Sequence, residues 1–80
     1  MEKTAKCIIY QDFALQYRWR LRSGEGATMA FAECGHHEKS GCAQELELWG
    51  LEYPDALVRD ATVRGFEKQP LSNWLASQAS

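Results

Sequence analysis

One segment of this sequence, Tyr17-Arg18-Trp19-Arg20-Leu21-Arg22, alternates strictly between apolar and basic side chains. Successive side chains of a β-strand point to opposite faces of a sheet, so a period of two predicts a strand. One face of that strand is apolar and needs cover, while the other carries three arginines and stays in contact with water. The rest of the chain therefore has to cover the apolar face or surround the arginine face.

The length and composition are those of a small folded protein, and we assign residues 1–80 to a single domain. A chain of this size buries only about 60% of the surface of its unfolded form, so its large aromatic side chains matter for the core. The net charge of −2 excludes a general attraction to phosphate polymers and leaves only local basic patches. The sequence has no apolar run of signal-peptide or membrane-spanning length, and its three cysteines are an odd number. We therefore expect a cytoplasmic protein without disulfides or membrane association.

Turn residues divide the first half of the chain into three strands. β-branched and aromatic residues predict a strand at 5–10, the alternating segment predicts one at 17–22, and a second alternating run predicts one at 27–34. Gly24 and Gly26 separate the second strand from the third, and glycine tolerates the positive φ of a tight turn. The simplest arrangement is an antiparallel meander.

The second half of the chain changes to a helical period. Apolar residues recur at i, i+4, i+7 and i+11 from Cys42 to Tyr53, which predicts an amphipathic helix at 39–52 on one face of the sheet. Pro54 ends this helix, because the residue before a proline is driven out of the α region. A fourth strand is predicted at 56–64.

The last segment predicts a short amphipathic helix. Pro70 suits a first helical turn, and apolar residues follow at i, i+3 and i+4 from Leu71 to Leu75. The predicted fold is therefore α+β in the order β-β-β-α-β-α, with an antiparallel sheet of three to four strands packed by one main helix. The predicted core spans residues 5–64, and residues 66–78 form a C-terminal helical extension.

Together these features resemble the YegP-like family of small bacterial domains of unknown function, also called UPF0339 or DUF1508. The resemblance is carried by Tyr17-Arg-Trp-Arg-Leu, a glycine turn, Leu46 and Trp49 on the buried stripe of the helix, and Pro54-Asp55-Ala56 followed by Asp60. Members carry one or two copies of a meander capped by a helix, which implies that a single copy pairs with itself. This chain carries one copy and departs from the family at Gly24-Glu25-Gly26, at His36 and in residues 65–80. The resemblance implies no activity, cofactor or catalytic residue.

Self-association or binding to another protein is the first functional hypothesis. Leu48 and Leu51 lie on a different side of the main helix from its buried stripe, so one sheet contact does not cover both sets. Either the tail helix or a second subunit has to cover them. The candidate interaction surface consists of Leu48, Leu51, Leu71, Trp74 and Leu75. We expect a small non-enzymatic interaction module that forms a homodimer or binds a protein partner.

A nucleic-acid-binding module is the second and less favoured hypothesis. The basic positions of the alternating segment are Arg18, Arg20 and Arg22. They recur about every 7 Å along the strand, close to the spacing of successive phosphates on one nucleic acid strand, and guanidinium groups suit phosphate. The favoured interpretation is that the open face of a half-buried sheet has to be polar, with Glu25 or Glu33 neutralising the arginines. Tyr17 and Trp19 point away from them, so neither ring is a platform for bases.

One grouping of residues has metal-ligand chemistry: Cys34, His36, His37 and Cys42. Their spacing matches no structural zinc pattern, and Cys42 lies on the buried stripe, where a cysteine needs no metal to explain it. We therefore assign no metal and no cofactor. A thiol and an imidazole that are neighbours in sequence lack an orienting acid and an oxyanion donor, so we expect no enzyme activity.

Overall fold

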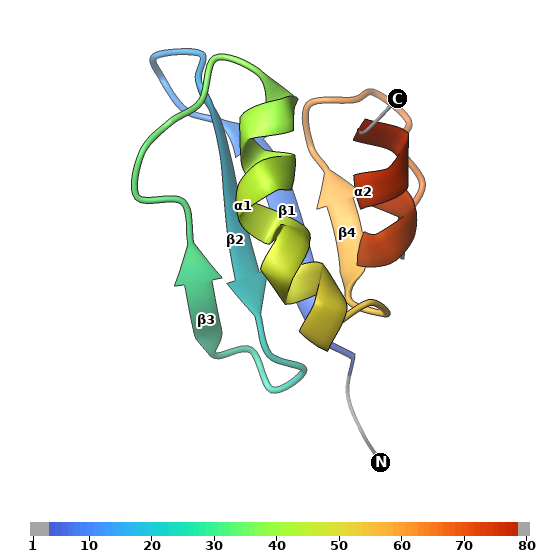
Figure 1. The fold of residues 1–80 in the computed structure, drawn as a ribbon. Coiled ribbons are helices and arrows are strands. Elements are labelled where there is room, and N and C mark those ends of the chain that lie inside the picture. The colour runs from blue at the N-terminus through green and yellow to red at the C-terminus, as the bar shows by residue number, and fades with distance from the viewer. Residues whose placement is uncertain (1–3, 79–80) are drawn as a thin grey trace.

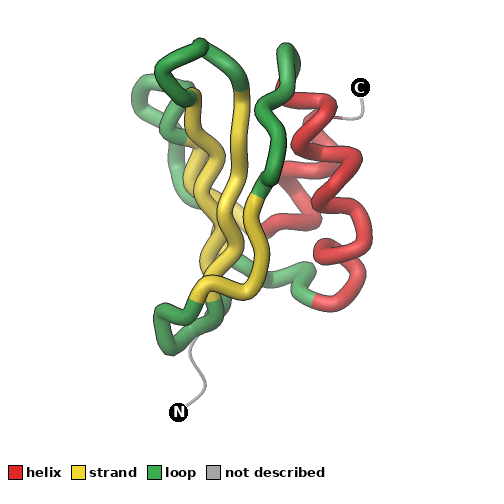
Figure 2. The backbone as a smooth tube through the Cα atoms, turned by 90° about the vertical axis from the view of Figure 1, so that its left-hand side faces the viewer, coloured by secondary structure: helices red, strands yellow, loops and turns green. Residues whose placement is uncertain are grey.

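In the computed structural model, which describes residues 4–78, the alternating segment is the second strand of a five-stranded sheet with two helices on one side (Figure 1, Figure 2). The elements in chain order are β1 (Lys6–Gln11), β2 (Tyr17–Arg22), β3 (Thr28–Phe31), α1 (Lys39–Glu52), β4 (Leu57–Asp60), β5 (Gln69–Pro70) and α2 (Leu71–Gln78). The predicted α+β fold is confirmed. Both helices form one layer, and no helix among the described residues covers the other face of the sheet, which we call the open face (Figure 2).

The sheet is mixed, in the order β3-β2-β1-β4-β5. β1, β2 and β3 form the predicted antiparallel meander, with Arg20 opposite Phe31. β4 instead lies parallel to β1, with Lys6 aligned with Leu57, which corrects the prediction of a purely antiparallel sheet. The reason is the length of α1, whose 14 residues span about 21 Å. This is enough to carry the chain back along the sheet, so β4 starts at the same end as β1.

The third and fourth strands are shorter than predicted, and β5 was not predicted. Beyond Phe31 the chain bends away, and it regains β2 at His36, whose backbone exchanges hydrogen bonds of 2.7 and 2.9 Å with Tyr17. β4 ends at Asp60, because the carboxylate of this residue accepts a hydrogen bond from the backbone N–H of Thr62 at 2.9 Å and closes a turn. β5 has two residues, too few for a pattern in the sequence to reveal.

The core lies between the sheet and the helices. Its buried apolar residues on the strands are Cys7, Ile9, Trp19, Leu21 and Val58, and those on the helices are Cys42, Ala43, Leu46, Leu71 and Trp74. Trp19 and Leu21 are 4% and 0% exposed, so the predicted apolar face of β2 is confirmed. The indole Nε1 of Trp19 also donates a hydrogen bond of 2.9 Å to Glu45 Oε1, which attaches β2 to α1.

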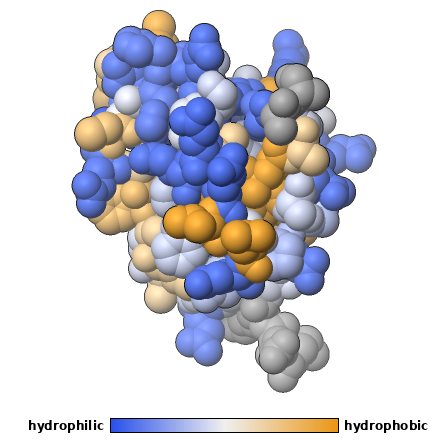
Figure 3. All heavy atoms as spheres, viewed as in Figure 1, coloured by the Kyte–Doolittle hydropathy of each residue, from blue (hydrophilic) through white to orange (hydrophobic). Residues whose placement is uncertain are grey.

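The main helix has the predicted bounds, residues 39–52. Its buried residues include Cys42 and Leu46 of the predicted stripe. Leu48 and Leu51 lie on the outer side of the helix and are 75% and 80% exposed. Figure 3 shows apolar side chains at the surface over α1. The sequence left two possible covers for these leucines, the tail helix or a second subunit. The tail helix does not cover them.

The tail helix α2 docks onto α1 within the same chain. Leu71 and Trp74 are fully buried, and the backbone N–H of Leu71 donates a hydrogen bond of 2.7 Å to the carbonyl of Ala56. Gly50 allows the two helices to approach closely, because a Cβ at this position would lie 2.5 Å from Leu75 Cδ1. This placement corrects the candidate interaction surface, since burial removes Leu71 and Trp74 from it.

An ion pair joins the start of α1 to the end of β4. Asp60 is 2% exposed, and its carboxylate accepts hydrogen bonds from Lys39 Nζ at 2.8 Å and from Thr62. Burial raises the pKa of Asp60, but the hydrogen bonds from Lys39 and Thr62 outweigh this effect and hold the pKa below its ordinary value of 3.8. The ionised carboxylate therefore stabilises the folded state at neutral pH.

The variant Asp60→Asn removes the negative charge and leaves Lys39 partly buried without a counterion. We expect it to lose about 3 kcal/mol of unfolding free energy at pH 7. A carboxylate with a lowered pKa loses its contribution as the pH falls, so the difference from the wild type should shrink as the pH drops through 3.8 and below. Urea unfolding followed by circular dichroism at several pH values measures both effects. The exposed Asp55→Asn is the matched control, and a deficit of Asp60→Asn that is independent of pH would contradict this account.

Candidate functional site

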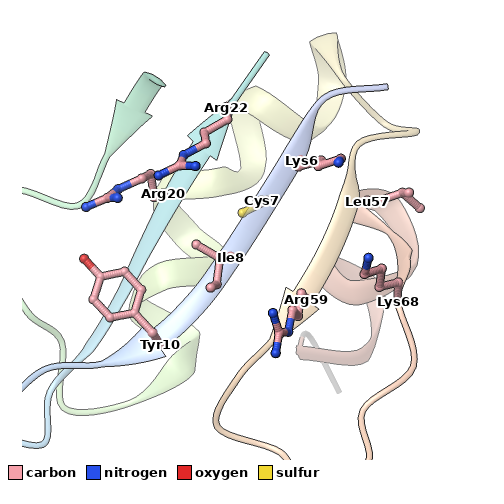
Figure 4. Close-up of a pocket in the computed structure, with 9 residues that line it drawn as sticks. All are labelled: Lys6, Cys7, Ile8, Tyr10, Arg20, Arg22, Leu57, Arg59 and Lys68. Carbon is pink, nitrogen blue, oxygen red and sulfur yellow. The ribbon is translucent and has the colours of Figure 1, made fainter. Parts of the chain in front are cut away.

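The open face of the sheet gathers cationic side chains from several strands. Alternate residues of each strand point to this face because the residues between them are in the core. The cations are Lys6, Arg20, Arg22, Arg59 and Lys68, five of the nine lysines and arginines of the chain. They line a hollow of about 420 Å³ that also includes Ile8, Tyr10 and Leu57 (Figure 4). We call this surface the basic hollow.

The register of the strands arranges these side chains in rows across the sheet. The first row contains Phe31, Arg20, Ile8 and Arg59, and the second contains Arg22, Lys6 and Leu57. Neighbouring strands are about 4.8 Å apart and alternate residues of one strand about 7 Å apart, so the cations are anchored at intervals of about 5 to 10 Å. The hollow is therefore an extended array of positive charge spread over three strands and the segment before β5.

Among residues 4–78, no acidic side chain lines the basic hollow, and the ion pairs engage other cations. Arg18, the third arginine of β2, donates a hydrogen bond from Nε to Asp12 Oδ2 at 2.7 Å. This bond and one from the backbone N–H of Gln16 hold the pKa of Asp12 below its ordinary value. Of the three arginines predicted to form an anion-binding face, the structure thus places Arg20 and Arg22 in the hollow and engages Arg18 elsewhere.

Acidic side chains gather in the helix layer. Glu45, Glu47 and Glu52 belong to α1, and Glu38 is its N-cap residue. These glutamates therefore lie on the opposite side of the sheet from the basic hollow. The net charge of −2 averages two unlike surfaces and does not describe the field above the open face.

Two aromatic residues outside β2 belong to the open face, and neither was predicted from the sequence. Tyr10 lines the basic hollow, and Phe31 lies on β3 opposite Arg20 with 57% of its surface exposed. Trp19 is buried, as predicted, and is no platform for a ligand. The signal that identifies Tyr10 and Phe31 is the pairing register of β1 and β3 with β2, which cannot be known before the strands are paired.

The exposed remainder of the candidate interaction surface is on the helix side. Leu48 and Leu51 of α1, which we call the leucine pair, are one helical turn apart and project from the same side of the helix. Leu75 is partly buried, with its side chain against Gly50. The leucine pair and the basic hollow therefore lie on opposite layers of the protein.

The structure separates the four candidate metal ligands. Cys34 and His37 are exposed, whereas Cys42 is buried in the core. His36 Nε2 lies 2.8 Å from Glu45 Oε1, the same oxygen that accepts the indole hydrogen bond of the core tryptophan. Across residues 4–78, no three side chains of histidine, cysteine, aspartate or glutamate are grouped closely enough to hold a metal ion.

Comparison with curated protein sequences identifies a relative. Over 53 residues this chain is 36% identical to a "UPF0339 protein" of Treponema denticola, a match that covers 66% of this chain and 90% of the relative. The chain belongs to the UPF0339 family. No protein-family model matches the sequence, and no solved structure matches it.

This match confirms the resemblance to the UPF0339 family. The name of the relative indicates no enzyme family and no ligand, so a function has to be inferred from the surfaces of the chain. In the part of the chain that the structure describes, neither helix has the length and apolar character needed to cross a membrane.

The three thiols should differ in reactivity. Burial raises the pKa of Cys7 to about 12 and that of Cys42 to about 11, so neither forms much thiolate near neutral pH, whereas Cys34 is exposed. Titration with 5,5′-dithiobis(2-nitrobenzoic acid) should modify one thiol rapidly in the native protein and three after unfolding in guanidinium chloride. Cys34→Ser should abolish the rapid reaction. Rapid modification of a second thiol would contradict the packing of β1 against α1.

Proposed function

We propose that this chain is a non-enzymatic binding domain that holds an anionic polymer on the open face of its sheet. The observation that carries the proposal is the basic hollow, which five cationic side chains and no acidic side chain of the described residues line. Like charges at such short intervals repel one another in the free protein, and a polyanion relieves that repulsion. A polymer is favoured over a single anion because the cations are spread across the sheet and do not converge on one point.

The types of cation support this proposal. Arg20, Arg22 and Arg59 present planar forked donors that match phosphate or sulfate oxygens, and Lys6 and Lys68 add point charges. The aliphatic stems of arginine can cover apolar residues such as Ile8 and Leu57 while the charged ends stay in water. Figure 4 shows the charged ends of these side chains over the open face, on the side of the sheet away from the helices.

The same surface favours binding without catalysis. In the part of the chain that the structure describes, the hollow is lined by no carboxylate and no imidazole that would act as a general acid or base. Its one thiol belongs to Cys7, which is 2% exposed and whose pKa burial raises to about 12, so it is a poor nucleophile. We therefore propose that this face binds a ligand and does not catalyse a reaction.

The double variant Arg20→Gln, Arg59→Gln removes two charges from the hollow without altering the core. We expect it to elute from a heparin column at lower salt than the wild type. The slope of log retention against log salt should fall by about 1 for each anionic group that the variant no longer binds. Arg64→Gln, an exposed charge in the loop after β4, is the matched control and should elute with the wild type. Equal elution of the double variant, the control and the wild type would overturn the proposed function.

We propose self-association as a second function, carried by the leucine pair. Leu48 and Leu51 are 75% and 80% exposed, and two apolar side chains one turn apart gain from removal from water. In a two-fold dimer the same patch meets itself, so one side of α1 serves both subunits. This function ranks second because α2 already completes the core within one chain. The open face stays accessible in such a dimer, so the two functions are compatible.

Leu48→Asp places a charge in the centre of that interface. We expect light scattering to give a dimer mass for the wild type, and a lower mass for the variant because a carboxylate is costly to bury between two helices. Leu15→Asp, at a position 73% exposed in the turn after β1, is the matched control and should keep the wild-type mass. A monomeric wild type at every concentration, or a dimer that survives Leu48→Asp, would contradict self-association through the leucine pair.

A further inference from the structure

An anionic polymer alone does not account for the aromatic rings on the open face. Phe31 lies on the side of the sheet away from the core and is 57% exposed, and Tyr10 is part of the basic hollow. Both rings are attached to strands and are not loop residues, so the sheet sets their spacing. They add apolar, flat surface to a face that is otherwise cationic.

Each ring has an arginine directly across the strand pair. Arg20 of the basic hollow is opposite Phe31, and Arg18, which pairs with Asp12, is opposite Tyr10. The two rings are two strands and one side-chain repeat apart, about 12 Å, with Arg20 on the strand between them. The free cation Arg20 therefore lies on the strand between the two rings, and a nucleic acid strand likewise offers both a flat base and a charged phosphate at each nucleotide.

We infer that the anionic polymer is a single-stranded nucleic acid, with one base stacked on Phe31, another on Tyr10, and the phosphates between them on Arg20 and its cationic neighbours. This inference rests on the proposed function. Single strands expose the faces of their bases, and open sheets bind them by stacking bases on aromatic side chains beside basic ones. A duplex keeps its bases paired and stacked about 3.4 Å apart, so rings about 12 Å apart on a flat face have nothing to stack on.

The test compares three fluorescently monitored ligands: oligothymidylate, the same strand annealed to oligoadenylate, and inorganic polyphosphate as a polyanion without bases. We expect the wild type to bind the single strand most tightly. Phe31→Ala and Tyr10→Ala should each weaken binding to oligothymidylate by roughly 5- to 100-fold, and leave binding to polyphosphate unchanged. Phe13→Ala, at a fully exposed ring in the turn after β1, is the matched control and should change neither affinity.

Phe31→Leu separates stacking from apolar bulk, and circular dichroism checks that every variant is folded. The leucine variant should bind oligothymidylate as weakly as Phe31→Ala. Phe31→Trp should bind it as tightly as the wild type, since only an aromatic ring stacks on a base. If the leucine variant binds like the wild type, or if all three ligands bind equally and the ring variants are silent, the inference is overturned while the proposed function stands. If none of the three ligands binds, both fail.

Discussion

The burial of Trp19 determines which side chains of β2 face the core and which face the open side of the sheet. Its ring is 4% exposed, and its Nε1 donates to Glu45 Oε1, so the residue is held both by packing and by a hydrogen bond to α1. Because side chains alternate along a strand, a tryptophan fixed beneath the helix sends Arg20 and Arg22 to the opposite face. A slip of one residue would bury the arginines and expose the ring, at a cost that this small core cannot offset. The cationic surface is thus a consequence of how the core is packed.

The elements that the sequence predicts well are those whose signal lies in consecutive residues. The alternation at 17–22 and the helical period at 39–52 are local, and both match the structure in their bounds. The tight turn after β2 is local too, and Gly26 adopts the positive φ of 95° that the glycine there implies. The direction of β4 and the pairing of β5 are not local, since they depend on where α1 returns the chain. The tail shows the same division, because its amphipathic pattern predicts a helix but not the surface on which Trp74 is buried.

The residues of the candidate site also differ in whether a local pattern in the sequence predicts their position. The outward direction of Arg20 and Arg22 follows from the period of β2, whereas Arg59 and Phe31 join them only through the register of other strands. The predicted counterions were also wrong, since Asp12 in the preceding turn pairs with Arg18, and no ion pair to Glu25 or Glu33 forms among the described residues. A total charge of −2 argued against an anionic ligand, but the charge is unevenly distributed, since no acidic side chain among residues 4–78 lines the basic hollow and three glutamates lie on α1.

All three tryptophans of the chain belong to the helix side of the sheet. Trp19 and Trp74 are buried in the core, and Trp49 stacks on Tyr53 with ring centres 6.1 Å apart. Indole emission therefore follows the packing on the helix side, while the rings of Tyr10 and Phe31 lie on the opposite side. The protein carries an optical reporter of its own core, separated by the thickness of one sheet from the surface on which a bound molecule would rest.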